Sequence, residues 1–451
     1  MRAVPRRAVV AWILFDPAAQ PVFTLITTFV FAPYFAGRLA ATPAEGQALW
    51  GFATAGAGVV IAVLSPILGA IADAAGRRKP WIAAFSVLLV LGCVLLWFTP
   101  PGAANSIPLA LAGFIVATLG VEFATVFNNA MMPDLVPAER LGRLSGTGWA
   151  VGYVGGLVSL VLMLSFALAN PATDRTIAGL VPVFGLDPAT GGGDRLSGPL
   201  SALWYVVLVL PLFLFVPDRP RRMAIGAAVR GGLAELVRTL RALGGRRNAA
   251  LYLLAHMIYA DGLVALFAFG GLYATGIFGW TSFEIGLFGI LLTITGTIGA
   301  LAGGPLDDRF GPKPVVMGSL LGLIVAAAAI LSISHDRIFF VVPVAPPVHG
   351  HGLFAATGER LYLALGAVIG GLAGPLQAAS RTLLARLAPR EEMTQFFGLY
   401  ALTGTLTSFA GPLLVGAVTA WTADQRAGMS ILLVFFVTGA VLLAAVRAPR
   451  R

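Results

Sequence analysis

The chain has 451 residues, of which 58% are apolar and only 11% are charged. About a quarter of the residues of a soluble globular protein are charged, so this composition excludes water as the main solvent of the folded chain. The formal net charge of +10 raises the question of nucleic-acid binding, and the single cysteine, Cys93, excludes a disulfide framework.

Twelve long apolar stretches follow one another along the chain. A helix needs about 20 apolar residues to cross about 30 Å of hydrocarbon, and the stretches have this length or more. They are continuous and do not alternate in ten-residue segments, which argues against an outer-membrane barrel. The predicted membrane-spanning helices lie at about 9–36, 48–72, 81–99, 106–132, 144–169, 199–216, 249–275, 282–303, 314–333, 360–380, 394–419 and 428–447.

The first stretch follows a basic N-terminus. It is about 28 residues long and contains Asp16 and Pro33, unlike the short core of a cleavable signal peptide, so we expect it to remain in the protein. The fifth stretch is rich in glycine, which is typical of close helix packing.

The distribution of basic residues gives the topology. With the N-terminus inside, 24 of the 30 lysines and arginines fall in inner segments. The positive-inside rule then predicts a multi-pass protein of the cytoplasmic membrane with both termini in the cytoplasm. The net charge is explained by topology, and no nucleic-acid partner is expected. The six basic residues left for the outer loops are Arg38, Arg175, Arg195, Arg337, Arg360 and Arg426.

The longest inner segment divides the spans six and six. It covers 217–248, carries eight arginines, and has apolar residues at helical spacing from Ile225 to Leu243. We therefore predict an N-terminal bundle over 1–216, a basic linker helix over 217–248 and a C-terminal bundle over 249–451. The linker could lie on anionic headgroups or be a solvated connection.

Two inner loops repeat one pattern of glycine, aspartate and basic residues. The first follows span two and the second follows span eight, with Gly, Asp, Gly at identical spacing and an offset of 235. Asp16 and Asp261 (offset 245) and Asn129 and Gln377 (offset 248) form weaker matches in the same order. The repeat is therefore parallel. The loop residues are Gly69, Asp73, Gly76, Arg77 and Lys79, matched by Gly304, Asp308, Arg309, Gly311 and Lys313.

These loops have a chemical interpretation. Glycine permits close helix approach and a tight turn, while aspartate can cap a helix start and pair with arginine. We predict an ion-paired gating latch between spans; a solvated turn is the alternative.

The loop motif resembles that of the major facilitator superfamily. Further strings resemble its autophagy-type vacuolar amino-acid effluxer branch, namely AWILFDPA from Ala11, VFNNAMMPDL from Val126, SGTGWAVGYVGG from Ser145, YADG from Tyr259, QAASRTLLARLAP from Gln377 and FFGLY from Phe396.

The resemblance implies an all-α membrane protein of two six-helix bundles. It would work by alternating access around a cavity between spans one, four, seven and ten. The implied cargo is a small polar solute such as an amino acid, with no cofactor and no enzymatic activity, and we expect a monomer. The chain departs from the branch after Asp16, where Pro17, Ala18, Ala19 and Gln20 replace a run of Trp, Ala, Asn and Ser.

Three carboxylates within spans are candidates for proton coupling. An aspartate at the bilayer centre costs about 2.5–3.5 kcal/mol on insertion scales, so such groups face a cavity or a partner. Asp16, Glu122 and Asp261 could exchange protons as the cavity opens, or could hydrogen-bond between helices.

Other polar groups near the inner ends of spans are substrate candidates. Asn128, Asn129 and Gln377 could bind a polar solute or tie helices together, and Arg381 could hold a carboxylate or pair with a headgroup or acidic residue. His256 alone is typical of a packed core histidine. No metal site is expected, because no ligand cluster joins His349 and His351.

The chain contains no Walker loop, nucleophile elbow or zinc-protease string. The favoured function is therefore secondary or facilitative transport. Export of amphiphilic compounds and a non-transporting membrane sensor or scaffold remain as alternatives.

Overall fold

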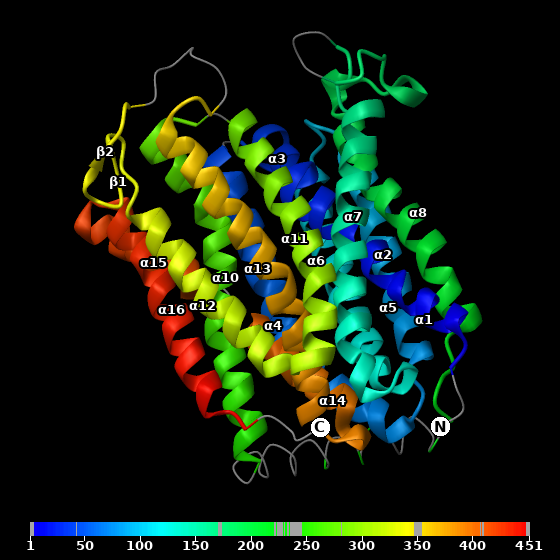
Figure 1. Cartoon of the computed structure of the whole chain (residues 1–451). Coiled ribbons are helices and arrows are strands. Elements are labelled where there is room, and N and C mark those ends of the chain that lie inside the picture. Colours follow the sequence, from blue (N-terminus) through cyan, green and yellow to red (C-terminus); the bar gives the residue numbers. More distant parts are fainter. Residues whose placement is uncertain are drawn as a thin grey trace. The chain divides into compact units, whose positions relative to one another are not determined.

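The computed structural model describes residues 4–41, 43–169, 174–220, 222, 229, 231, 234, 246–280, 282–346, 354–405, 407 and 410–447. Within these ranges the regular structure is helical apart from one small hairpin (Figure 1). The predicted all-α fold class is therefore confirmed. Most of the predicted linker helix, together with His349 and His351, lies outside the described residues.

Eleven helical segments of the described residues are long and apolar enough to cross a membrane. Ten consist wholly or largely of one α-helix each, and these are α4 (Pro43–Ala75), α5 (Lys79–Leu95), α6 (Ser106–Leu135), α7 (Leu141–Phe166), α8 (Gly192–Phe215), α10 (Arg247–Phe278), α11 (Ser282–Phe310), α12 (Pro312–Leu331), α13 (Thr357–Leu387) and α16 (Gln425–Ala445).

The first span is a series of short helical pieces. Pro17 and Pro21 lie in it, and a proline cannot donate the backbone hydrogen bond that an α-helix requires. The backbone widens into π-helix after Pro21. The pieces are α1 (Arg6–Ile13), α2 (Phe15–Pro21), η1 (Val22–Phe29), α3 (Phe31–Tyr34) and η2 (Phe35–Leu39).

The predicted span 394–419 differs from a single helix. It consists of α14 (Met393–Thr405) and α15 (Ala410–Thr422), each of 13 residues. The sequence between Thr403 and Pro412 contains several glycine, threonine and serine residues, which have lower helix propensity than the flanking aliphatic residues.

The remaining elements are short. Strands β1 (Arg337–Ile338) and β2 (Val342–Pro343) pair antiparallel, with Ile338 opposite Val342. The 3-10 turns are η3 (Leu96–Phe98), η4 (Ala138–Arg140), η5 (Val183–Gly185), η6 (Pro188–Thr190) and η7 (Arg390–Glu392).

The chain forms two compact units. Unit 1 contains residues 1–136, 151–237 and 390–402, and unit 2 contains 137–150, 238–389 and 403–451. The start of α7 packs in unit 2 and most of α14 packs in unit 1, and the division at 217–248 stays a prediction. Each sequence half thus lends one segment to the unit built mainly by the other.

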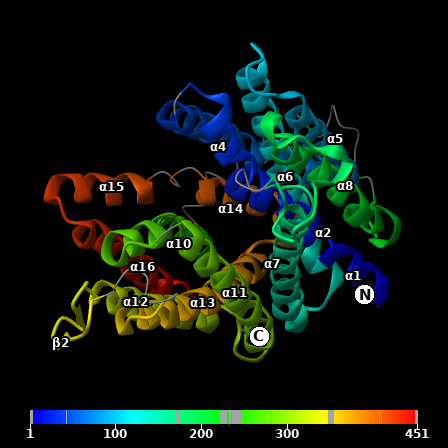
Figure 2. The ribbon, with the colours of Figure 1, turned by 90° about the horizontal axis from the view of Figure 1, so that it is seen from above.

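Small residues let the helices of each unit pack closely. In unit 1, α5 lies between α6 and α8 in its contacts (Figure 2), and a Cβ at Gly92, Gly113 or Gly120 would clash with the facing helix of the α5 and α6 pair. In unit 2, Gly299 and Gly303 of α11 contact α13 in the same way. Close backbone approach of this kind replaces the hydrophobic driving force that is missing between helices in lipid.

The glycine-rich face of α7 gives a test of this packing. A Cβ at Gly155 would lie 2.6 Å from the Cβ of Pro17, so Gly155→Ala should destabilise unit 1 by about 1–3 kcal/mol through overpacking. Gly56→Ala is the control, because nothing lies within 4 Å of that position. Reaction of buried Cys93 with a thiol-reactive dye during heating reports the unfolding of purified protein. Equal unfolding temperatures for the two variants would contradict the packing assignment.

Candidate functional site

The first repeated loop holds the start of α14 within unit 1. Asp73 lies near the end of α4, and its carboxylate accepts hydrogen bonds from the hydroxyl of Thr394 (2.6 Å) and the backbone N–H of Gln395 (2.9 Å). These groups belong to the first turn of α14, whose backbone donors have no partner within the helix. Asp73 therefore acts as a helix cap supplied from another element, and the helix dipole favours its negative charge.

Gly69 explains the close approach. A Cβ at this position would lie 2.6 Å from the carbonyl oxygen of Thr394 and 2.9 Å from the Cα of Gln395. Any larger residue would push α14 away from α4 and lengthen the hydrogen bonds to Asp73.

Arg78 is the buried cation of this loop. Its side chain is 1% exposed and lies 3.4 Å from the carboxylate of Asp73 and 2.8 Å from that of Asp134. Its Nε also donates to the hydroxyl of Thr394, and one terminal nitrogen donates to the carbonyl of Ala130. Burial lowers the pKa of the Arg78 guanidinium from its ordinary value, and the charge of Asp73 opposes that shift.

Asp134 connects Arg78 to Arg219, which follows α8 in the chain. Arg219 donates to both oxygens of Asp134, at 2.7 and 2.8 Å, in the paired geometry that suits arginine and carboxylate. The guanidinium of Arg219 also donates to the carbonyl of Arg390. We call the set Asp73, Arg78, Asp134, Arg219, Thr394 and Gln395 the unit 1 latch.

The basic residues of this loop that the sequence pattern predicted, Arg77 and Lys79, are not part of the buried network. Arg77 is exposed, while the Nζ of Lys79 donates to the carbonyl of Phe213 at the end of α8. Arg78 was not among the predicted site residues, because three consecutive basic residues give no sign of which one is buried. Asp134, Arg219, Thr394 and Gln395 were missed as well, since they lie far from the loop in sequence.

The second loop has the same geometry within unit 2. Asp308 accepts from the backbone N–H of Arg143 (3.2 Å), which is the third residue of α7 just as Gln395 is the third residue of α14. A Cβ at Gly304 would lie 3.0 Å from the Cα of Arg143. The Nε of Arg143 lies 3.6 Å from Asp308, but its side chain is 68% exposed.

Two further members of the second loop match the first. Gly76 and Gly311 have φ angles of 90° and 89°, which favour glycine. Lys313 donates to the carbonyls of Ala444 and Val446 at the end of α16, as Lys79 donates to that of Phe213 at the end of α8. Arg309 is exposed and lies over the ring of Phe310.

Asp307 is a buried acid that the sequence reasoning missed. It accepts a hydrogen bond from Thr382 and lies 3.4 Å from Arg386, both on α13. The first loop has Ala72 at the matching position, so the repeat pattern could not point to Asp307.

Arg381 holds the start of α7. The guanidinium is buried, its Nε donates to the hydroxyl of Ser145 (2.8 Å), and a terminal nitrogen donates to the carbonyl of Ser145 (2.8 Å). Ser145 in turn donates to the carbonyl of Ala378. The described contacts of Arg381 are thus structural ones between α13 and α7.

The other candidates of unit 1 lie on two helices. Asp16 is half-buried on α2. A Cβ added at Gly152 would lie 3.4 Å from the Cβ of Asp16. Glu122 is half-buried on α6, whereas Asn128 and Asn129 are buried there. Neither the Nδ2 nor the Oδ1 of the Asn128 side chain has a hydrogen-bond partner in the described part of the chain. The backbone carbonyl of Asn128 accepts a hydrogen bond from the indole of Trp12.

Asp261 and Gln377 lie in unit 2. Asp261 is 3% exposed on α10, and its Oδ1 has no hydrogen-bond partner in the described ranges. Gln377 is half-buried on α13 and donates to the carbonyl of Ala373 one turn earlier.

A buried polar cluster accompanies them in unit 2. Tyr259 and Ser380 share a hydrogen bond of 2.6 Å, and Tyr252 donates to the carbonyl of Ser380. The Nδ1 of His256 lies 3.1 Å from the hydroxyl of Thr403. Spacing of i, i+4, i+7 on α10 places the three aromatic residues on one face, and this periodicity was the available sequence signal.

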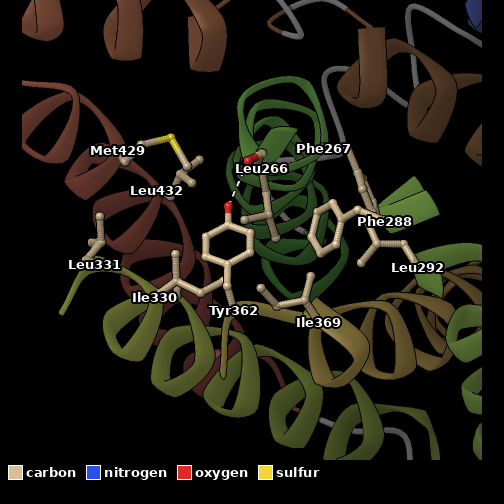
Figure 3. Close-up of a pocket in the computed structure, with 12 residues that line it drawn as sticks. Leu266, Phe267, Phe288, Leu292, Ile330, Leu331, Tyr362, Ile369, Met429 and Leu432 are labelled. Atoms are coloured by element: carbon tan, nitrogen blue, oxygen red, sulfur yellow. Dashed lines mark hydrogen bonds between the residues drawn. The ribbon is translucent and has the colours of Figure 1, made fainter. Parts of the chain in front are cut away.

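An apolar pocket lies between five helices of unit 2 (Figure 3). Its accessible volume is about 20 Å³, and the hydroxyl of Tyr362 donates to the carbonyl of Gly270 beside it. The other lining residues are apolar and come from α10, α11, α12, α13 and α16: Leu266, Phe267, Phe288, Leu292, Ala327, Ile330, Leu331, Ile369, Met429 and Leu432.

Comparison with known proteins then decides the family. The family described as "Vacuole effluxer Atg22 like" matches residues 51–451. The chain belongs to this family. The predicted resemblance is confirmed, and the protein is a multi-pass membrane transporter of the major facilitator type and not an enzyme.

Its relatives include both bacterial and fungal proteins. The uncharacterized MFS-type transporter YxiO of Bacillus subtilis is 26% identical over 438 residues, covering 96% of this chain and 93% of that one. Autophagy-related protein 22 of Cryptococcus neoformans is 27% identical over 319 residues, covering 68% of this chain and 53% of its own. The match thus spans about half the length of that fungal relative.

Solved structures share the fold. The proton:xylose symporter XylE has a TM-score of 0.70 at 14% identity, with 98% of this chain and 96% of that chain covered. The human organic anion transporter MFSD10 has a TM-score of 0.67 at 15% identity, with 97% and 99% covered.

The burial of Arg78 gives a direct test of the unit 1 latch. Arg78→Ala leaves the buried carboxylate of Asp73 without its cation and should destabilise unit 1 by about 3–5 kcal/mol. Arg77→Ala, one residue earlier and exposed, should stay within about 0.5 kcal/mol of the parent. The Cys93 dye assay measures both, and the assignment is wrong if the two variants unfold at the same temperature.

Proposed function

We propose that the chain is a secondary or facilitative transporter that moves a small polar solute, such as an amino acid, by alternating access. We place it in the cytoplasmic membrane with both termini in the cytoplasm, on the basis of its basic residues. The family description supports transport, while the solute and the cycle are our inferences from the residues below.

The observation that carries alternating access is the paired capping of α14 and α7. Asp73 of the first sequence half holds the start of α14 from the second half, and Asp308 holds the start of α7 from the first. Lys79 and Lys313 instead bond within their own halves. In this proposal, a movement of one sequence half against the other breaks the two caps while the lysine bonds persist.

Proton coupling is supported by the carboxylates within the spans. Asp261 is buried in a helix of the apolar segment 247–278, and one of its oxygens has no described partner. An ionised carboxylate in this setting loses its hydration without full replacement, which favours proton uptake. Asp16 and Glu122 are half-buried, and the same loss of hydration would favour proton uptake by their carboxylates.

The polar solute is supported by the neutral hydrogen-bonding groups of the spans. Asn128 and Asn129 of unit 1, and His256 and Gln377 of unit 2, combine donors with acceptors. Such groups suit a small solute with several polar atoms. Arg381 contributes less than its charge suggests, because its donors are engaged with Ser145.

Export of an amphiphilic compound is a second candidate. The apolar pocket of unit 2 is the observation that favours it, since its lining is almost entirely aliphatic and aromatic.

Counterflow in proteoliposomes tests transport itself. Vesicles loaded with unlabelled amino acids should take up labelled solute of the matching kind, whereas amphiphiles should compete only if the second candidate holds. A protein that binds these ligands but shows no counterflow with any of them would be a sensor or scaffold, and the proposal would be wrong.

Uptake driven by a pH gradient tests the coupling residues. With Asp261→Asn or Asp16→Asn, uphill uptake should fall at least about tenfold while counterflow remains, because the amide cannot carry a proton. Glu122→Gln is measured in parallel, and Asp336→Asn, in the exposed hairpin, is the control. Unchanged uphill uptake in all three span variants would exclude proton coupling through these residues.

A further inference from the structure

An open hollow lies in unit 1 where α5 begins and α8 ends. Its accessible volume is about 620 Å³. Its lining residues are Arg77, Lys79, Pro80, Ala83, Phe213, Asp218, Arg219 and Pro220.

The rim of this hollow is basic. Arg77 is exposed, and no described residue forms an ion pair with it. The ammonium group of Lys79 donates one hydrogen bond to the carbonyl of Phe213, and its two other N–H groups can bind further acceptors. Asp218 accepts from the backbone N–H groups of Arg78, Lys79 and Arg219, so its carboxylate is already engaged by the backbone.

The inner wall of the hollow is apolar. Ala83 lies one turn into α5, and Pro80 and Phe213 complete the wall. Beyond them, exposed aliphatic residues continue along both helices at i, i+4 spacing, with Val87 and Leu91 on α5 and Leu210 and Leu214 on α8. In a protein of the membrane these faces meet hydrocarbon, so the basic rim lies where the hydrocarbon of the bilayer ends.

We propose that this hollow binds the headgroup of an anionic phospholipid, with Arg77 and Lys79 as the phosphate ligands. Arginine offers a paired donor geometry that fits phosphate, and lysine adds a point charge. The apolar wall and the aliphatic stripes favour a lipid over a free anion, because they give the acyl chains a continuous surface to follow.

The site also touches the unit 1 latch. Arg219 lines the hollow and donates to both oxygens of Asp134, which lies 2.8 Å from Arg78. A phosphate in the hollow therefore changes the charge around the latch, and lipid binding is linked to the stability of the α4 and α14 contact.

The repeat supplies a matched control. Arg309 and Lys313 are an arginine and a lysine of the second loop and carry the same charges as Arg77 and Lys79, although they do not stand at the positions that the offset of 235 matches to them. Arg309 lies over Phe310, and Lys313 is engaged by the carbonyls of Ala444 and Val446. Substituting either pair removes the same charge from a basic loop, so a general attraction to anionic lipid would respond equally.

Native mass spectrometry of the purified full chain with added phosphatidylglycerol or phosphatidylcholine tests the proposal. The parent protein should retain phosphatidylglycerol in preference to phosphatidylcholine. Each lost cation should weaken this binding by about fivefold, so Arg77→Gln combined with Lys79→Gln should lose about 25-fold. Arg309→Gln combined with Lys313→Gln should retain the parent affinity.

Three outcomes would overturn the proposal. They are equal losses in the two double variants, no preference for phosphatidylglycerol over phosphatidylcholine, and displacement of the lipid by millimolar inorganic phosphate, which would identify a free-anion site. If the Lys79→Gln change impairs folding, the single change Arg77→Gln decides, because that side chain is exposed and should still lower the affinity about fivefold. An unchanged affinity in Arg77→Gln would also count against the site.

Discussion

The burial of one guanidinium controls the structure of unit 1 at the ends of α4 and α14. Arg78 can leave water only because Asp73 and Asp134 supply two negative charges and because Thr394 and Ala130 accept its remaining protons. Without those partners the desolvation of a charge costs several kcal/mol. The contacts of this one cation therefore join α4, α6 and α14 within unit 1.

The two loops are alike in geometry and unequal in energy. Asp73 and Asp308 both cap the first turn of a helix, but Arg78 is buried whereas Arg143 is 68% exposed. An exposed pair contributes about 0–1 kcal/mol because water and salt screen it. Unit 2 compensates in part through Asp307, whose partners Thr382 and Arg386 lie on α13. The two loops thus share their geometry, while their ion pairs differ in burial.

Sequence reasoning found the features that depend on local pattern. Apolar length predicted the spans, and matched spacing predicted the glycines and aspartates of both loops. It could not identify Arg78, because burial of one among three basic neighbours depends on residues about 50 and 300 positions away. It could not predict that Arg381 bonds to Ser145, because an arginine near a span end carries no mark of its partner. The break between α14 and α15 was missed because hydropathy is insensitive to helix propensity.

Charged residues are few in this chain, and those of the loops differ from Asp261 in how their hydrogen bonds are satisfied. The buried charged groups of the described loops are each matched by a partner or a helix terminus, so their role is to fix contacts between helices at one end of each unit. Asp261 differs, because one of its oxygens has no described partner. A protein that satisfies Arg78 and Asp307 so fully retains an incompletely satisfied acid only at a cost in stability. That contrast is why we propose Asp261, and not a residue of the loops, as the group whose protonation is coupled to transport.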